Sequence, residues 1–122
     1  TEHRVGPFAP TLQGGRGAAE VIAARRAKAV ICFNDLMAIG LMKGLAERGI
    51  RVPEQVSIVG FDNIFASALI APGLTSVAAP LTMLGDAAVR VIVARLNGTK
   101  PPENLPVTVP VRLMVRGSTG PA

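Results

Sequence analysis

The chain has little of the chemistry on which many enzymes and metalloproteins depend. It contains one cysteine, Cys32, and one histidine, His3, and it has no tryptophan or tyrosine. A single cysteine excludes an internal disulfide and a cysteine-built metal site. The missing aromatic residues argue against base stacking, and so against nucleic-acid binding by this segment. We expect Cys32 to be a small buried apolar residue and His3 to lie at the surface.

Acidic residues are also scarce. Eight Asp and Glu stand against thirteen Lys and Arg, and the basic residues are scattered along the chain. Apolar residues make up 49% of the sequence, which predicts a packed core. No apolar run is long enough to span a bilayer, and no charged leader precedes an apolar segment. We therefore expect a cytoplasmic protein with no membrane partner.

Two similar stretches dominate the sequence. Residues 29–35 and 56–63 are each an apolar run that ends in Phe followed by an Asn/Asp pair, and a helix-length segment separates them. The order strand, helix, strand predicts a parallel α/β sheet, which binds ligands at the carboxyl ends of its strands. Two of the three aspartates, Asp35 and Asp62, stand at these ends. Phe33 and Phe61, just before the pairs, are expected in the core.

Helical periodicity and end signals predict the other elements. The glycines at 14 and 15 predict an irregular region before the first helix. The helix after the first strand has clear ends, because Asn34 or Asp35 can cap it and Gly49 can end it. The expected elements are helices at 17–28, 36–48 and 81–96, β-like segments at 74–77 and 105–116, and a frayed tail from 117.

The helix at 36–48 is apolar nearly all round. A helix of this kind is covered on more than one side. One side must pack on the sheet. The side around Ile39, Met42 and Lys43 then needs either another element of the same lobe or a second subunit.

Three polar or aromatic side chains follow three expected strands, the first of which is a strand tail expected at residues 3–5. Phe8, Asn34 and Asp62 can meet on one rim, where a ring face, an amide and a carboxylate suit a polyhydroxylated or heterocyclic ligand. Asn34 is equally well explained as a helix cap, and Asp35 as a first-turn residue stabilised by the helix dipole. Because no regular helix clearly begins after Asp62, a binding role explains that residue better.

Catalytic motifs are missing from the sequence. It has no nucleophile elbow, no phosphate-binding lysine loop, no dinucleotide fingerprint and no His or Cys cluster. The glycines at 14–17 are expected to form a hinge before a helix. We therefore predict no catalytic residues, no cofactor and no metal. A small metal-dependent α/β enzyme using Asp35 and Asp62 remains an alternative.

Three segments together carry a resemblance to a known family. Residues 33–40, 48–63 and 72–77 resemble the effector domain of the LacI/GalR (lactose/galactose-repressor) family, and 6–8 and 113–119 match its flanks more loosely. The resemblance implies a three-layer α/β/α parallel sheet of the periplasmic-binding-protein-like type I, represented mainly by its carboxyl-terminal lobe. It implies the following division: 1–76 in that lobe, 77–106 crossing to the amino-terminal lobe, 107–117 returning as a strand, and 118–122 as a tail.

The resemblance also implies a function. The chain is expected to be a fragment of a ligand-responsive repressor that binds a carbohydrate-like effector through Asp62 and Asn34, with Phe8 stacked on it. Operator DNA would be bound only through a missing amino-terminal domain. A periplasmic-type sugar receptor of the same fold is the alternative. The family's homodimer interface corresponds to Ile39, Met42, Lys43, Phe65, Leu69 and Ile70.

Overall fold

The computed structural model describes residues 4–101 and 108–121. The chain divides into two compact units, one formed by Thr1–Ala78 with Leu113–Ala122 and the other by Ala79–Arg112. The division expected from the sequence, into 1–76, 77–106, 107–117 and 118–122, and its assignment to two lobes stay predictions.

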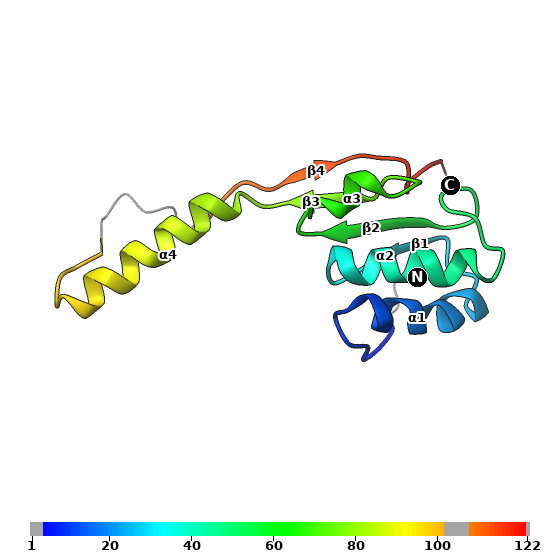
Figure 1. The fold of residues 1–122 in the computed structure, drawn as a ribbon, viewed down its shortest axis with the longest axis horizontal. Coiled ribbons are helices and arrows are strands. Elements are labelled where there is room, and N and C mark those ends of the chain that lie inside the picture. The colour runs from blue at the N-terminus through cyan, green and yellow to red at the C-terminus, as the bar shows by residue number, and fades with distance from the viewer. Residues whose placement is uncertain (1–3, 102–107, 122) are drawn as a thin grey trace. The chain divides into compact units, whose positions relative to one another are not determined.

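The first unit is built around a sheet (Figure 1). Strands β1, β2 and β3 are parallel neighbours, as predicted, and β4 follows β3 at the edge. The elements are α1 (Leu12–Ala24), β1 (Ala29–Ile31), α2 (Asp35–Ala46), β2 (Ser57–Phe61), α3 (Ala66–Leu69), β3 (Thr75–Ala78) and β4 (Arg112–Met114).

Helix α1 begins earlier than the sequence predicted. Thr11 caps it by accepting a hydrogen bond from Gly14 N at 3.1 Å, so the glycines at 14–17 lie inside the helix and form no hinge. The glycines permit close packing of α1 on α2. A Cβ at Gly15 would overlap the carbonyl of Met37, and one at Gly40 would overlap the carbonyl of Leu12. Of the glycines that looked like loop residues, Gly15 is therefore a helix-packing residue.

The close packing of α1 explains part of the apolar surface of α2. The sheet covers one side of α2 and α1 covers another, and Met42 is only 8% exposed within the same core. Helix α1 packs on the side of α2 that carries Gly40 and Gly44, whereas the side around Ile39, Met42 and Lys43 points elsewhere, with Lys43 exposed and Ile39 half-buried. What covers that side stays a prediction. The ends of α2 are as predicted, with Asn34 as its cap and Gly49 left-handed at φ 70°.

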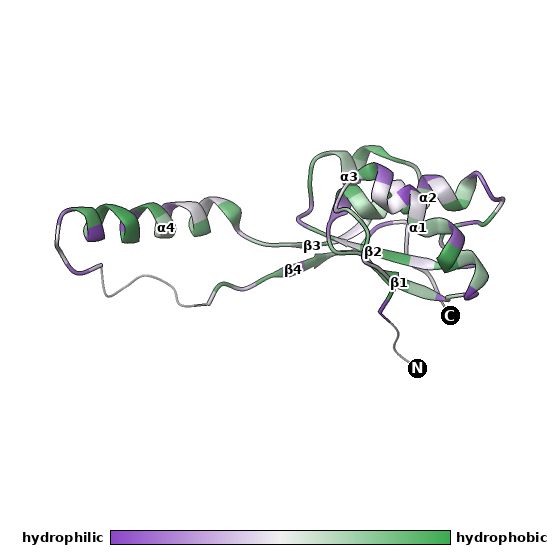
Figure 2. Ribbon diagram, turned by 90° about the horizontal axis from the view of Figure 1, so that it is seen from below, coloured by the Kyte–Doolittle hydropathy of each residue, from purple (hydrophilic) through white to green (hydrophobic). Residues whose placement is uncertain are grey.

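Helices α1, α2 and α3 of the first unit lie on one side of the sheet (Figure 2). Side chains alternate along a strand, so Cys32 and Ile58 face the helices and are buried. Ile31, Phe33 and Phe61 are 82%, 77% and 40% exposed, which makes the expected burial of the two phenylalanines wrong. Among the described residues of the first unit, no helical layer covers their face. These residues therefore supply the sheet and one of the two helical layers of the predicted fold.

The segment after β4 is ordered into the sheet, which makes the prediction of a frayed tail wrong. Ser118 is fully buried, and its hydroxyl donates to Ile58 O at 2.6 Å and accepts from Thr75 N at 2.8 Å. Its backbone N–H donates to Gly73 O and its carbonyl accepts from Ile58 N. Ser118 thus satisfies backbone groups around two strands that are distant in sequence.

The second unit consists mainly of α4 (Leu81–Leu96), whose bounds agree with the prediction. It follows Pro80 and ends at Asn97 and Gly98, where Gly98 has a positive φ of 67°. Of the predicted strand at 105–116, the observed β4 forms part, and residues 102–107 lie outside the described residues. Within the described part of the chain, no helix combines the length and apolarity needed to cross a membrane.

Candidate ligand-binding site

The register of β1 and β2 aligns Asn34 with Asp62. Ile31 pairs with Val59, an offset of 28 residues, and the same offset relates Asn34 to Asp62 beyond the strand ends. Because the strands are parallel, both residues follow carboxyl ends at the same edge of the sheet. Both residues therefore lie at the edge of the sheet that the sequence predicted to bind a ligand.

Asn34 is a helix cap that also contacts the segment before α1. Its Oδ1 accepts a hydrogen bond from Met37 N at 2.9 Å, and its Nδ2 donates to Pro10 O at 3.2 Å. The amide keeps one further N–H and one further lone pair for a ligand. The capping interpretation is therefore confirmed, and it does not exclude a binding role.

Phe8 lies in the same segment, two residues before Pro10. Its ring is half-buried and packs against the core of the first unit. The hydrogen bond from Asn34 to Pro10 attaches this segment to the start of α2. A half-buried ring on such a segment can offer one face to a ligand. Its stacking role stays a prediction.

Asp62 has an unusual backbone conformation. Its φ is 105°, and the next residue, Asn63, has a φ of 52°. A non-glycine residue in such a conformation costs on the order of 1–3 kcal/mol, and these conformations are concentrated at functional sites. The Asp62 N–H donates to Val77 O at 3.0 Å, and no regular helix begins until Ala66. Within residues 4–101 and 108–121, no hydrogen bond or ion pair engages the half-buried Asp62 carboxylate.

Asp35 has a structural role that sequence reasoning missed. It lies in the first turn of α2 as expected, but its carboxylate is fully buried. One oxygen accepts from Ile64 N at 2.9 Å and from the Ser67 hydroxyl at 2.6 Å, and the other accepts from the Ser76 hydroxyl at 2.6 Å. A Cβ at Gly60 would overlap this carboxylate. Since its lone pairs serve these donors, Asp35 is a poor metal ligand, and the metal-enzyme alternative loses one of its two carboxylates.

Arg116 is a residue that the motif analysis did not single out. It lies just after β4, and its guanidinium donates to Asn63 Oδ1 at 2.7 Å and to Leu74 O at 2.6 Å. Its only signal in the sequence is its place in the run 113–119, which resembles the family flank. The turn that carries Asp62 is thus held from β3, α2 and the segment after β4.

Cys32 precedes this edge at the end of β1. Its side chain is buried, as predicted. Burial, with a smaller contribution from the negative charge of Asp35, raises the pKa of its thiol to about 12. A thiol with this pKa carries almost no thiolate at neutral pH, so Cys32 is unsuited to nucleophilic chemistry.

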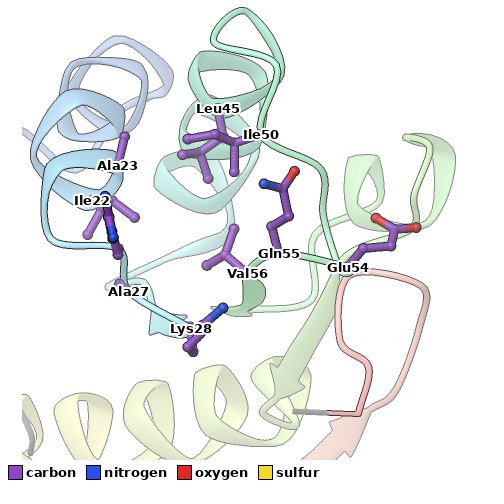
Figure 3. Close-up of a pocket in the computed structure, with 10 residues that line it drawn as sticks. Ile22, Ala23, Ala27, Lys28, Leu45, Ile50, Glu54, Gln55 and Val56 are labelled. Atoms are coloured by element: carbon purple, nitrogen blue, oxygen red, sulfur yellow. The ribbon is translucent and has the colours of Figure 1, made fainter.

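A pocket of about 340 Å³ lies at the other end of the strands (Figure 3). Lys28, just before β1, and Val56, just before β2, line it together with Ile22 of α1 and Leu45 of α2. The amino ends of β1 and β2 border this pocket, whereas Asn34 and Asp62 follow their carboxyl ends. The candidate site therefore lies away from this pocket, and the pocket was not predicted from the sequence.

The residues predicted for a dimer interface differ in exposure. Phe65 and Leu69, at α3, are 82% and 67% exposed, and Lys43 of α2 is exposed. Ile39 and Ile70 are half-buried against the core, and Met42 is buried. Met42 belongs to the core of the first unit, and the interface roles of all six residues stay predictions.

A family model for the periplasmic binding protein-like domain matches residues 2–119. The chain belongs to this family. Its relatives within the family are LacI-type regulators, which confirms the resemblance seen in the sequence. The regulator MalR of Streptomyces coelicolor is 41% identical over 112 residues, which cover 92% of this chain and 32% of MalR. This periplasmic-binding-protein-like chain thus spans about a third of the length of that curated relative.

Solved structures agree with this assignment. A LacI family transcriptional regulator from Arthrobacter sp. FB24, in complex with lactose, superposes with a TM-score of 0.77 at 34% identity, covering 93% of this chain and 44% of that one. A LacI family regulator from Enterococcus faecium with bound ribose gives a TM-score of 0.82 at 34% identity, with 95% and 43% coverage. The periplasmic-binding-protein-like fold predicted for this chain is therefore confirmed.

Proposed function

We propose that this chain forms part of a ligand-responsive transcriptional repressor and contributes to its effector-binding and dimerisation region. Operator DNA would be bound by a separate amino-terminal domain, and the protein would act in the cytoplasm without catalysing a reaction. The relatives named above are transcriptional regulators, which favours this role over that of a transport receptor with the same fold.

One observation carries the proposal: at the same sheet edge as Asn34, the carboxylate of Asp62 stands on a strained backbone and has no partner among the described residues 4–101 and 108–121. A carboxylate accepts hydrogen bonds from two neighbouring hydroxyl groups, and an amide both donates and accepts. Paired hydroxyls are the chemistry of a sugar ring, and an aromatic ring such as Phe8 would stack on its C–H face. The lactose and ribose in the neighbouring structures support a carbohydrate as the effector class.

Effector binding would regulate DNA binding through a population shift. A ligand that contacts one arrangement of the effector domain more favourably than another favours that arrangement. A tenfold difference in affinity between two arrangements corresponds to about 1.4 kcal/mol of coupling free energy. In this scheme the chain supplies part of the ligand contacts and transmits the change in domain arrangement to the dimer interface.

The dimer would form through α3 and the neighbouring face of α2. Phe65 and Leu69 expose large apolar side chains there, and Lys43 and the half-buried Ile39 and Ile70 belong to the same expected surface. Exposed large apolar residues grouped in this way are typical of protein interfaces. Met42 would contribute only by supporting this surface from within the core.

The test uses the complete regulator that contains this chain, titrated by calorimetry with a sugar panel that includes lactose and ribose. Asp62→Ala removes an acceptor of charge-assisted hydrogen bonds, each contributing about 1.5–3 kcal/mol. For the sugar that binds the wild type, we expect a loss of about 100-fold in affinity and an unchanged circular dichroism spectrum.

Glu20→Ala is the matched control, because Glu20 is an exposed carboxylate on α1. It should leave the Kd unchanged. An unchanged Kd for Asp62→Ala would refute the site. A wild-type regulator that binds no sugar of the panel would refute the effector class.

A further inference from the structure

The direction of the Asp62 carboxylate depends on the turn that carries it. Asp62 and Asn63 both have positive φ values, of 105° and 52°. Residues other than glycine are disfavoured in this region of φ. Two of them in succession therefore persist only where their surroundings hold them. Because the backbone sets the direction of the Cα–Cβ bond, a relaxed turn would point the carboxylate elsewhere.

Asn63 is held on two sides. Its backbone N–H donates to the Ser76 hydroxyl at 3.0 Å, and that hydroxyl donates in turn to buried Asp35. Its side-chain Oδ1 accepts from Arg116 Nη2 at 2.7 Å. The first anchor belongs to the interior of the unit. The second comes from a residue 53 positions further along the chain.

Arg116 is itself fixed in place. Its Nη1 donates to Leu74 O at 2.6 Å, and its backbone N–H donates to the Thr75 hydroxyl at 2.9 Å. The planar guanidinium thus spans two oxygens, one on Leu74 and one on Asn63. A lysine ammonium is a point charge without this fork, so it cannot reproduce the bridge.

We propose that Arg116 is a positioning residue for the effector site and acts through Asn63 on the carboxylate of Asp62. This inference rests on the proposed function. It assigns Arg116 a role in affinity in addition to its role in the sheet. The bridge to Asn63 presents Asp62 to the ligand, whereas the bond to Leu74 fixes the guanidinium.

The test measures Kd for the bound sugar and Tm in the complete regulator. Arg116→Lys and Asn63→Ala should each weaken binding by about tenfold or more, by analogy with the loss seen when hydrogen bonds that orient metal ligands are removed. Asn63→Asp keeps the acceptor for Arg116 and should retain affinity within about twofold. Arg112→Ala, on exposed β4, is the matched control and should leave Kd unchanged.

A double-mutant cycle separates positioning from general destabilisation. If Arg116 acts through Asp62, Arg116→Lys should weaken binding much less in an Asp62→Asn background than in the wild type. Equal losses in both backgrounds would overturn the proposal. So would a lowered Tm with wild-type Kd in both Arg116→Lys and Asn63→Ala.

The outcomes for Asp62→Asn distinguish this inference from the proposed function. A wild-type Kd for Asp62→Asn refutes the proposed site and the positioning role with it. If Asp62→Asn weakens binding while Arg116→Lys and Asn63→Ala both keep the wild-type Kd, the role of Arg116 is refuted and the proposed site stands.

Discussion

Replacing Asp35 with alanine is expected to be among the most destabilising single changes in the first unit. The substitution leaves three donors without their acceptor: the N–H of Ile64 and the hydroxyls of Ser67 and Ser76. Each buried donor without a partner costs about 1–3 kcal/mol, and part of this is regained because a buried charge is also removed. We expect a net loss of about 3–5 kcal/mol, a large share of the 5–15 kcal/mol that stabilises a typical domain.

Asp35→Asn should cost only about 1–2 kcal/mol, because one amide oxygen still accepts from Ile64 and Ser67 while the Ser76 hydroxyl loses its acceptor. Urea denaturation followed by circular dichroism gives the free energy of unfolding for each variant. Asp86→Ala breaks only an exposed pair with Arg90 and should change it by less than about 0.5 kcal/mol. A loss below about 1 kcal/mol for Asp35→Ala, or equal losses for the alanine and asparagine variants, would refute the reasoning.

Three further predictions concern packing, reactivity and assembly. Gly40→Ala places a Cβ against the backbone of Leu12 and should lower the free energy of unfolding by about 1–3 kcal/mol, whereas Gly85→Ala, in open space on α4, should raise it by up to about 1 kcal/mol. Cys32 should resist alkylation at pH 8 in the native protein and react in urea, since its raised pKa keeps the thiol protonated; rapid native labelling would contradict this. Phe65→Asp in the complete regulator should shift sedimentation from dimer toward monomer, and an unchanged dimer would argue against α3 as its interface.

Local signals predicted much of the fold. The bounds of α4 and the cap of α2 depend on residues within a few positions of each end, so their sequence pattern is sufficient. The alignment of Asn34 with Asp62 follows from two similar strands that pair in parallel. For this reason the edge of the sheet that carries the candidate site could be predicted before the structure.

The parts that could not be predicted depend on distant contacts. The packing role of Gly15 depends on Met37, which belongs to another helix, and a glycine run without that context resembles a loop. The burial of Asp35 depends on Ser76, 41 residues away, whereas its place in a first turn suggested only a residue stabilised by the helix dipole. Arg116 lies 53 positions along the chain from Asn63, its hydrogen-bond partner. Periodicity and capping rules do not reach over such separations.

The buried hydroxyl of Ser118 has a consequence for folding on the ribosome. It bonds to Ile58, which is synthesised 60 residues earlier, and to Thr75, 43 residues earlier. Until the ribosome has made Ser118, the carbonyl of Ile58 and the N–H of Thr75 lack this hydrogen-bond partner. Helix α4 is synthesised during that interval. Pairing over such long sequence separations slows folding and exposes strand edges to other chains. Premature termination between α4 and Ser118 would therefore release an incompletely folded chain with unpaired strand edges, which is prone to aggregate and would be bound by chaperones.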